Sequence, residues 1–176
     1  MTLYDVAVVG AGPAGSRAAY SSAKHGLKTL LLEEHSCVGR PVHCAGKLYS
    51  KAFQEFNLPM EPIINQVRGA YFYSPKNIVF SIHKKEVDSY IIDRERLDRL
   101  LAERAQDAGA ELSLATKCMD IQNSPDGCKV LVTKRKGETW EVKARVVMDA
   151  EGWNSVLAEK LGLNRKVHFL RGIQYE

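Results

Sequence analysis

The chain has 176 residues, of which 45% are hydrophobic and 26% are charged, and its formal net charge is +4. This length and composition suit one globular domain or slightly more. Lysine and arginine are spread along the chain, which argues against a nucleic-acid partner. No apolar run reaches the ~20 residues of a membrane-crossing helix, and the N-terminus shows no signal-peptide pattern. We therefore expect a cytoplasmic protein.

The first 26 residues carry the strongest pattern in the chain. Residues 3–9 are mostly apolar and rich in valine, which predicts a strand buried on both faces, as in a parallel sheet. The glycine-rich turn GAGPAG follows, and residues 13–25 are predicted to form a helix that Gly26 ends. Because N–H groups at a helix N-terminus bind anions, this strand–turn–helix predicts a pyrophosphate site.

Each residue of the glycine-rich turn has an expected role. Gly10 allows the tight turn out of the strand, and Gly12 lets a pyrophosphate approach the backbone. Gly15 lets the helix pack closely on the strand. Pro13 opens the helix, and the backbone N–H of Ala14 is expected to face the phosphates.

An acidic residue follows the second predicted strand. Residues 29–32 form that strand, and Glu33 comes directly after it, at the spacing where a carboxylate accepts hydrogen bonds from ribose hydroxyls. Its neighbour Glu34 is expected to point away. An acid rather than an arginine at this place favours FAD or NAD over NADP.

The middle of the chain departs from strand–helix alternation. A short helix is predicted over residues 47–56. Three strands are predicted next, over residues 67–73, 78–83 and 87–92, with the first two joined by a turn at residues 74–77. Three strands in succession predict a separate antiparallel layer facing the cofactor or the substrate.

The second half begins with an amphipathic helix and ends with further strands. The helix is marked by Leu97, Leu100, Leu101, Ala105 and Ala108 and is capped by Gly109. A β-meander is predicted over residues 112–121, 129–133 and 139–144, followed by another buried strand over residues 145–149. Arg94 opens the helix, where a cation opposes the helix dipole.

Five segments carry a resemblance to a known family. They are VVGAGPAGSRAA, LLLEEH, GRPVHCAGKL, DRERLDRLLAERAQDAGAEL and VVMDAEGWNSVLAEKLGL. They resemble the geranylgeranyl reductases, within the wider class of FAD-dependent aromatic hydroxylase-like oxidoreductases. The segment at residues 39–46 is the most specific to this family.

The resemblance implies a cofactor, a reaction and partners. Such enzymes hold FAD and reduce carbon–carbon double bonds in isoprenoid chains, and archaeal members saturate digeranylgeranylglycerophospholipids. The implied partners are an isoprenoid lipid and an electron donor, either a reduced nicotinamide or a ferredoxin-like protein. Peripheral contact with a membrane surface is implied as well.

The same resemblance assigns residues near the cofactor. It places Arg94 near the pyrophosphate, where the alternative is an ion pair with Glu95 or Asp98. It places the backbone of Cys118 at the adenine.

At the flavin, the resemblance implies that the backbone of Ala45 and Lys47 lines the ring. It places Cys44 beside the ring, as a candidate catalytic thiol or pocket-shaping residue, with a buried space-filling cysteine as the alternative. His43 is a proton-donor candidate by residue type alone.

Two further patterns bear on the site. Glu151 and Gly152 stand where related flavoproteins carry an Asp-Gly pair, and we expect a structural turn there, with Ser155 beginning a helix. The four cysteines form no C-x-x-C pair, so we expect reduced thiols and no metal site.

These patterns together predict an α/β fold, a Rossmann-like FAD-binding domain of the glutathione reductase or aromatic hydroxylase type with an antiparallel β-layer. Residues 1–165 are expected to form this domain, with residues 67–92 as a β-layer inserted near the flavin side. Residues 166–176 are expected to start a substrate domain. Because the family continues beyond this point, we expect an N-terminal portion, incomplete at its C-terminus, that holds FAD weakly and does not reduce alkenes alone.

Two alternatives to an alkene reductase stay open at this point. One is an FAD-dependent monooxygenase with the same fold, in which reduced flavin activates oxygen. The other is a non-catalytic dinucleotide-binding fragment.

Overall fold

The computed structural model describes residues 2–42, 44–163, 170 and 172. The chain divides into two compact units, one made of Met1–Pro41 and Asp98–Glu176 and the other of Val42–Leu97. The expected start of a substrate domain at residues 166–176 lies outside the described residues, apart from Leu170 and Gly172. The first unit is therefore built from two separate stretches of sequence.

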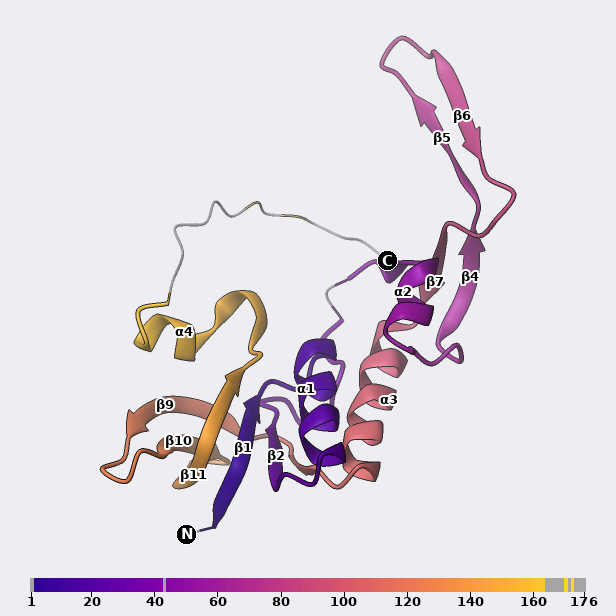
Figure 1. Ribbon diagram of the computed structural model, residues 1–176. Helices are drawn as coiled ribbons and strands as arrows, with labels where there is room; N and C mark the ends of the chain where they lie inside the picture. Colours follow the sequence, from indigo (N-terminus) through magenta and orange to yellow (C-terminus); the bar gives the residue numbers. More distant parts are fainter. Residues whose placement is uncertain (1, 43, 164–169, 171, 173–176) are drawn as a thin grey trace. The chain divides into compact units, whose positions relative to one another are not determined.

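A six-stranded sheet forms the centre of the first unit (Figure 1). Its strand order is β8-β2-β1-β11-β10-β9. In chain order the strands are β1 (Leu3–Val9), β2 (Thr29–Leu32), β8 (Glu111–Ser113), β9 (Lys117–Asn123), β10 (Lys129–Arg135) and β11 (Glu138–Asp149). The neighbours from β8 to β11 pair in parallel, while β9, β10 and β11 pair antiparallel.

Two long helices accompany the sheet. Helix α1 (Pro13–Lys24) follows β1 directly, and α3 (Arg94–Asp107) precedes β8. Both end at the expected glycines, since Gly26 and Gly109 adopt positive φ angles of 77° and 102°. A short 3-10 turn, η1 (Gly152–Asn154), and a last helix, α4 (Val156–Lys160), follow β11.

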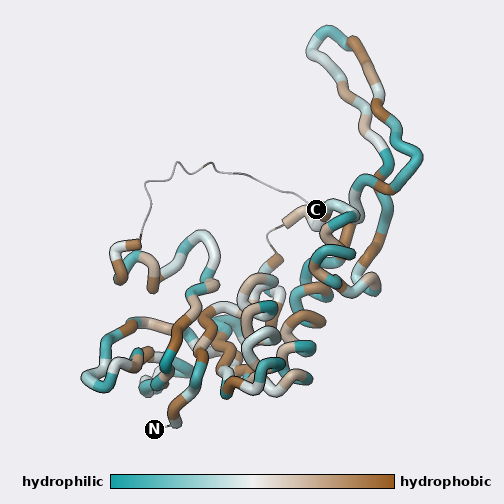
Figure 2. The backbone as a smooth tube through the Cα atoms, in the orientation of Figure 1, coloured by the Kyte–Doolittle hydropathy of each residue, from teal (hydrophilic) through white to brown (hydrophobic). Residues whose placement is uncertain are grey.

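The apolar core of the first unit forms two clusters, and residues 6–9 of β1 alternate between them. Val6 and Val8 pack with alanines of α1 and α3 in one cluster. Ala7 and Val9 belong to the other, with Leu131 of β10 and residues of β11 and α4. Strand β1 is therefore buried on both faces, as its continuous apolar run predicts. Figure 2 shows brown, hydrophobic segments on the central strands, as well as in other parts of the chain such as the ribbon at residues 69–83.

Strand β11 differs from the prediction in two ways. Residues 139–144 and 145–149 form one continuous twelve-residue strand rather than two, because one half pairs with β10 and the other half pairs with β1. The expectation of a buried strand at residues 145–149 is wrong, since Val146 and Met148 are 49% and 38% exposed. The parallel pairing, not burial, fixes this half in the sheet.

The strand predicted over residues 112–121 is wrong as a single element. Strands β8 and β9 lie at opposite edges of the sheet, so the chain must leave one edge and cross to the other. It turns at Ala115, which has a φ of 52°. The backbone N–H groups of Ala115 and Thr116 donate to the carbonyl groups of His35 and Glu33 at 2.8 and 2.7 Å. The crossing segment is thus fixed to the residues after β2.

The second unit contains a three-stranded antiparallel sheet in the order β3-β7-β4 and a two-stranded ribbon of β5 and β6. Its elements are β3 (Lys47–Tyr49), α2 (Ser50–Glu55), β4 (Ile63–Val67), β5 (Gly69–Tyr73), β6 (Val79–His83) and β7 (Ser89–Ile92). The expected antiparallel strands are present, but the expectation that they form one layer is wrong, because β5 and β6 pair only with each other while β7 pairs with β3 and β4. The predicted helix over residues 47–56 is wrong for its first three residues, which form β3 and pair with β7. Strand β4 is not predicted from the sequence, because its residues do not alternate in polarity.

Candidate nucleotide-binding site

The N-terminus of α1 lacks a side-chain cap. Gly12 is the N-cap residue, Pro13 occupies the first turn, and no acidic residue lies in that turn. Pro13 and Ala14 are exposed. The first-turn N–H groups therefore present the positive end of the helix dipole without a side-chain acceptor, which suits the oxygens of a phosphate.

The three glycines of the turn have different physical reasons. A Cβ on Gly10 would lie 2.4 Å from the Ala150 carbonyl oxygen, and one on Gly15 would lie 1.8 Å from the Gly10 carbonyl oxygen. Gly12 has an ordinary φ of −67°, and a Cβ there would meet nothing within 4 Å. Packing within the chain therefore requires Gly10 and Gly15 but leaves open space at Gly12, where the close approach of a pyrophosphate stays a prediction.

Glu33 is largely buried and its carboxylate is bound to the turn. Oε2 accepts a hydrogen bond from the backbone N–H of the fully buried Ala11 at 2.9 Å. Oε1 lies 3.0 Å from the donating backbone N of His35 and 2.6 Å from its ring Nδ1. A carboxylate has about four acceptor positions, so capacity for a ribose hydroxyl is left.

The bond between Ala11 and Glu33 gives Glu33 a structural role that sequence reasoning missed. The apolar side chain of Ala11 gives no signal that its N–H needs an acceptor, and only the fold brings the two together. The two-residue spacing between Glu33 and His35 could have suggested their contact. Glu33 therefore fixes the turn, whatever else it binds.

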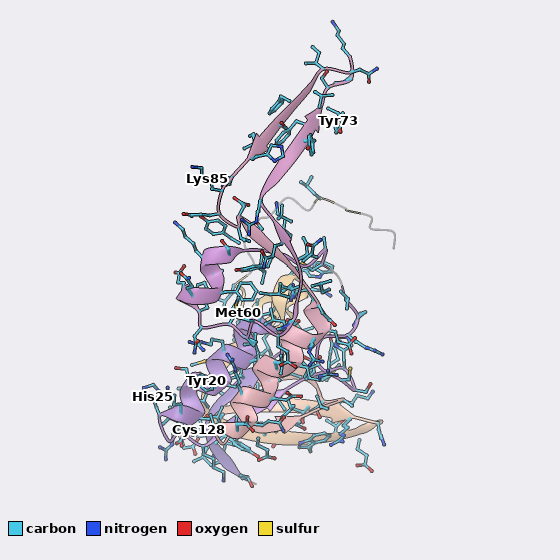
Figure 3. All side chains as sticks on the ribbon, turned by 90° about the vertical axis from the view of Figure 1, so that its right-hand side faces the viewer. Tyr20, His25, Met60, Tyr73, Lys85 and Cys128 are labelled. Carbon is cyan, nitrogen blue, oxygen red and sulfur yellow. The ribbon has the colours of Figure 1, made fainter. Side chains whose placement is uncertain are left out.

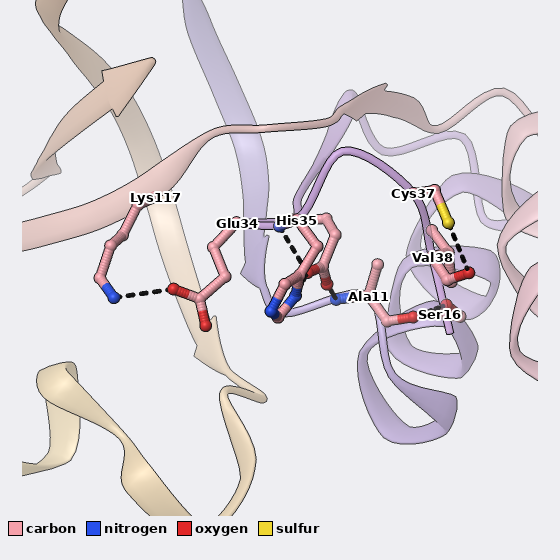
Figure 4. Close-up of polar contacts among 8 residues, drawn as sticks. Ala11, Ser16, Glu34, His35, Cys37, Val38 and Lys117 are labelled. Atoms are coloured by element: carbon pink, nitrogen blue, oxygen red, sulfur yellow. Dashed lines mark hydrogen bonds and ion pairs between the residues drawn. The ribbon is translucent and has the colours of Figure 1, made fainter. Parts of the chain in front are cut away.

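Glu34 lies in a different environment. It is exposed, and its Oε2 lies 2.7 Å from Nζ of Lys117 on β9. Figure 4 shows this pair apart from the contacts around Ala11 and His35. The two adjacent acids therefore have different partners. Glu33 binds the glycine-rich turn, and Glu34 binds a surface lysine.

Cys118 on β9 is buried, with 2% of its surface exposed. Burial and, after it, the charge of Glu151 raise the pKa of its thiol to about 12. Its Sγ donates weakly to the Asp120 carbonyl oxygen at 3.5 Å. A neutral buried thiol does not act as a nucleophile, so any contact with adenine would come from the backbone.

The second unit holds the residues expected near the flavin. Cys44 and Ala45 are exposed, which does not support the alternative of a space-filling buried cysteine at position 44. The backbone N–H of Gly46 donates to Cys44 Sγ at 3.4 Å, and Lys47 begins β3 opposite Ile91. His43 lies outside the described residues.

Arg94 is the first residue of α3 and is partly buried. This residue takes part in interactions within the chain. The expected role of Arg94 at the pyrophosphate stays a prediction.

The segment after β11 is held by its own polar side chains. Glu151 Oε2 accepts from Ser155 Oγ at 3.0 Å and from the Leu157 N–H at 2.9 Å. Ser155 caps α4 by accepting from the Ala158 N–H at 2.8 Å, as expected of a residue that begins a helix. Glu151 therefore closes a structural turn.

No group of three metal-ligating side chains occurs within the part of the chain that the structure describes. The four cysteines are unbridged. The site is accordingly made of backbone N–H groups and one buried carboxylate.

Comparison with known proteins identifies related chains. The family of FAD dependent oxidoreductases matches residues 5–160. The digeranylgeranylglycerophospholipid reductase of Methanocaldococcus jannaschii is 39% identical over 166 residues, which cover 93% of this chain and 42% of that protein. The chain thus spans less than half the length of this relative.

Solved structures share the fold. A geranylgeranyl bacteriochlorophyll reductase-like protein from Thermoplasma acidophilum has a TM-score of 0.83 at 31% identity, over 92% of this chain and 42% of that one. A p-nitrophenol 4-monooxygenase from Pseudomonas putida has a TM-score of 0.78 at 18% identity, over 92% and 44%. The Rossmann-like FAD-binding fold expected from the sequence is confirmed.

Substitution of the glycines should separate folding from nucleotide binding. Gly12→Ala should change the free energy of unfolding by no more than about 1 kcal/mol but weaken FAD binding at least about tenfold. Gly15→Ala should destabilise the fold by roughly 3 kcal/mol, because its Cβ would collide with backbone. Denaturant unfolding and FAD titration measure the two effects, and unchanged FAD affinity in Gly12→Ala would contradict the ligand explanation.

The adjacent acids provide a second matched pair. Glu33→Gln keeps an acceptor for the Ala11 N–H but loses the charge, and should weaken FAD binding by about 1.5–3 kcal/mol. Glu34→Gln removes a surface ion pair worth about 0–1 kcal/mol of stability and should leave FAD binding unchanged. Titration of both variants with FAD tests the assignment, and equal losses of affinity would show that Glu33 does not bind the ribose.

Proposed function

The chain belongs to the family of FAD-dependent oxidoreductases, and on that premise we propose that it forms the FAD-binding part of an enzyme that reduces carbon–carbon double bonds in the geranylgeranyl chains of isoprenoid lipids. The observation that carries the proposal is the 39% identity with a digeranylgeranylglycerophospholipid reductase over 93% of the chain. The monooxygenase with a similar fold is only 18% identical, so it supports the fold and not the reaction.

FAD is the cofactor, and the residues present fit it. The uncapped N-terminus of α1 and the open space at Gly12 suit the pyrophosphate, and Glu33 suits the ribose. When bound, reduced FAD supplies a hydride to one alkene carbon, and a proton reaches the other. In this proposal Arg94 contributes to the pyrophosphate site and the backbone of Cys118 to the adenine site.

At the flavin end, the proposal assigns the backbone of Ala45 and Lys47 to the ring and Cys44 to its vicinity. The domain boundaries belong to the same proposal. Residues 1–165 form the FAD-binding domain, residues 67–92 its β-layer on the flavin side, and residues 166–176 begin the substrate domain.

The proposed partners follow from the proposed substrate. An isoprenoid lipid is the acceptor, and a reduced nicotinamide or a ferredoxin-like protein is the electron donor. No helix among the described residues is long and apolar enough to cross a bilayer. We propose a cytoplasmic protein that meets its lipid by peripheral contact with a membrane surface.

Cysteine labelling tests the flavin assignment. A thiol reagent near neutral pH should modify the exposed Cys44 and leave Cys118 unmodified until the protein unfolds, because burial raises the pKa of Cys118 to about 12. Added FAD should slow the labelling of Cys44, as peptide mapping by mass spectrometry would show. Labelling of Cys44 that is indifferent to bound FAD would contradict its place beside the flavin.

The reaction itself is tested in two steps. The purified chain should release FAD on denaturation, and release of NAD without flavin would contradict the cofactor. A chimera in which the chain replaces the matching 166 residues of the Methanocaldococcus jannaschii reductase should then add pairs of hydrogen atoms to a digeranylgeranyl lipid, measured by mass spectrometry.

The Gly12→Ala chimera is the matched control and should lose this activity. Oxygen consumption coupled to hydroxylation would instead establish the monooxygenase alternative. Adenine-nucleotide binding without any redox turnover would establish the non-catalytic alternative.

A further inference from the structure

The carboxylate of Glu33 has fewer open positions than a ribose has hydroxyl groups. An ionised carboxylate accepts about two hydrogen bonds at each oxygen. Oε2 of Glu33 accepts one, from the Ala11 N–H at 2.9 Å. Oε1 is occupied twice by His35, since it lies 3.0 Å from the backbone N and 2.6 Å from ring Nδ1. One position therefore remains, on Oε2, whereas the adenosine ribose of FAD offers a 2′- and a 3′-hydroxyl group.

The His35 ring is the donor in its contact with Glu33. An ionised carboxylate only accepts hydrogen bonds, so Nδ1 carries a proton whether the imidazole is neutral or charged. A charged imidazole holds the carboxylate more strongly than a neutral one, because the attraction between opposite charges is added to the hydrogen bond. The strength of this contact therefore depends on the protonation state of the ring.

Of the three donors on the Glu33 carboxylate, the imidazole is the one that can leave. The Ala11 N–H belongs to a fully buried residue of the turn. The backbone N–H of His35 is fixed, because the carbonyl groups of Glu33 and His35 accept from Thr116 and Ala115 at 2.7 and 2.8 Å. The His35 side chain, by contrast, is 47% exposed. Rotation about its own side-chain bonds withdraws the ring without moving the backbone.

We propose that the His35 imidazole occupies the second ribose position of Glu33 and is displaced when the carboxylate binds both ribose hydroxyls. The competing ligand is the adenosine ribose of FAD, so the proposal rests on the proposed function. His35 thereby sets the affinity of the site for the ribose, and it acts through Glu33 rather than on the reacting atoms.

The other charged groups of this region have partners of their own. Glu34 lies 2.7 Å from Nζ of Lys117 on the crossing side of the sheet. Helix α1 contains no acidic residue, and its first cation, Arg17, lies over the ring of a neighbouring tyrosine. After β11, Glu151 accepts hydrogen bonds within its own turn. Glu33 is therefore the carboxylate that holds the imidazole.

This contact makes recognition of the ribose depend on pH. Histidine side chains take up a proton as the pH falls from about 8 to about 5. The charged ring then holds Glu33 more strongly and resists displacement. Ribose binding should therefore weaken as the pH falls, while a site with no competing imidazole should keep the same preference for a ribose across this range.

A pair of nucleotides that differ only in their ribose hydroxyls tests the proposal. ADP carries the adenosine and the pyrophosphate of FAD, and 2′,3′-dideoxy-ADP carries the same charge without either hydroxyl. The full 176-residue chain, freed of any bound flavin, is titrated with each nucleotide. The dissociation constant of 2′,3′-dideoxy-ADP divided by that of ADP is here called the ribose ratio. Effects of phosphate charge cancel in it, and for the unaltered chain it should rise about fivefold or more from pH 5.5 to pH 8.

Two substitutions of His35 should remove this pH dependence in different ways. His35→Phe keeps a ring that cannot donate, so its ribose ratio at pH 5.5 should exceed that of the unaltered chain at least about tenfold and stay constant to pH 8. His35→Gln keeps a donor that does not titrate, so its ribose ratio should be lower than that of His35→Phe and equally constant. Where His35→Phe is unstable, His35→Gln still tests the pH dependence.

His25→Phe is the matched control. His25 is the C-cap residue of α1, at the opposite end of the helix from the glycine-rich turn, and it is labelled in Figure 3. It is exposed, and its Nδ1 lies 2.7 Å from the Ser21 carbonyl oxygen. The substitution therefore removes a similar contact of an exposed histidine without touching Glu33. Its ribose ratio and pH dependence should match those of the unaltered chain.

Several results would overturn the proposal. A lower ribose ratio in His35→Phe than in the unaltered chain would show that the imidazole supports ribose binding. Equal ratios at pH 5.5, or a pH dependence that persists in both His35 variants, would show that the ring does not compete. FAD released on denaturation is measured for every variant. Any of these results with normal FAD content refutes the competition alone, whereas a chain that binds neither ADP nor FAD refutes the proposed function with it.

Discussion

The hydrogen bonds of Glu33 are the constraint on which the nucleotide side of the structure depends. Its carboxylate accepts the buried Ala11 N–H at 2.9 Å, while its own N–H donates to the Ser113 carbonyl oxygen at 2.9 Å and its carbonyl accepts from Thr116 at 2.7 Å. One residue therefore connects the glycine-rich turn, the end of β2, the end of β8 and the segment that crosses to β9. Because a buried N–H without an acceptor is costly, the turn cannot move without breaking this set.

The sequence predicts the nucleotide motif well because each of its parts has a local cause. An apolar run before glycines and a helix before Gly26 are properties of neighbouring residues, and the structure places β1 and α1 there. The exposure of Val146 and Met148 has no local cause, since their composition suits burial and only the arrangement of neighbouring elements decides it. The bond between Ala11 and Glu33 is similar, because it joins residues that the sequence separates by a whole helix.

The glycines of a single sequence motif can be needed for different physical reasons, as the glycine-rich turn shows. A Cβ at Gly10 or Gly15 would lie 2.4 or 1.8 Å from a backbone carbonyl oxygen of the chain. These two glycines are therefore required by the fold. A Cβ at Gly12 would meet nothing within 4 Å, so no packing within the chain requires this glycine, and its role at a pyrophosphate stays a prediction. Proteins with different reactions share this fold, as the similarity to a monooxygenase at 18% identity illustrates.

The continuous strand β11 imposes an order on the formation of the sheet. Leu3 of β1 pairs with Lys143 and Val9 pairs with Asp149, so β1 must wait for the much later β11 before its second neighbour exists. Contacts this distant in sequence slow folding, because the entropy of closing a long loop is lost before the pairing stabilises it. The hairpins between residues 42 and 97 close over short distances and can form on the ribosome, while β1 stays an unpaired edge on the β11 side until residues 143–149 have emerged.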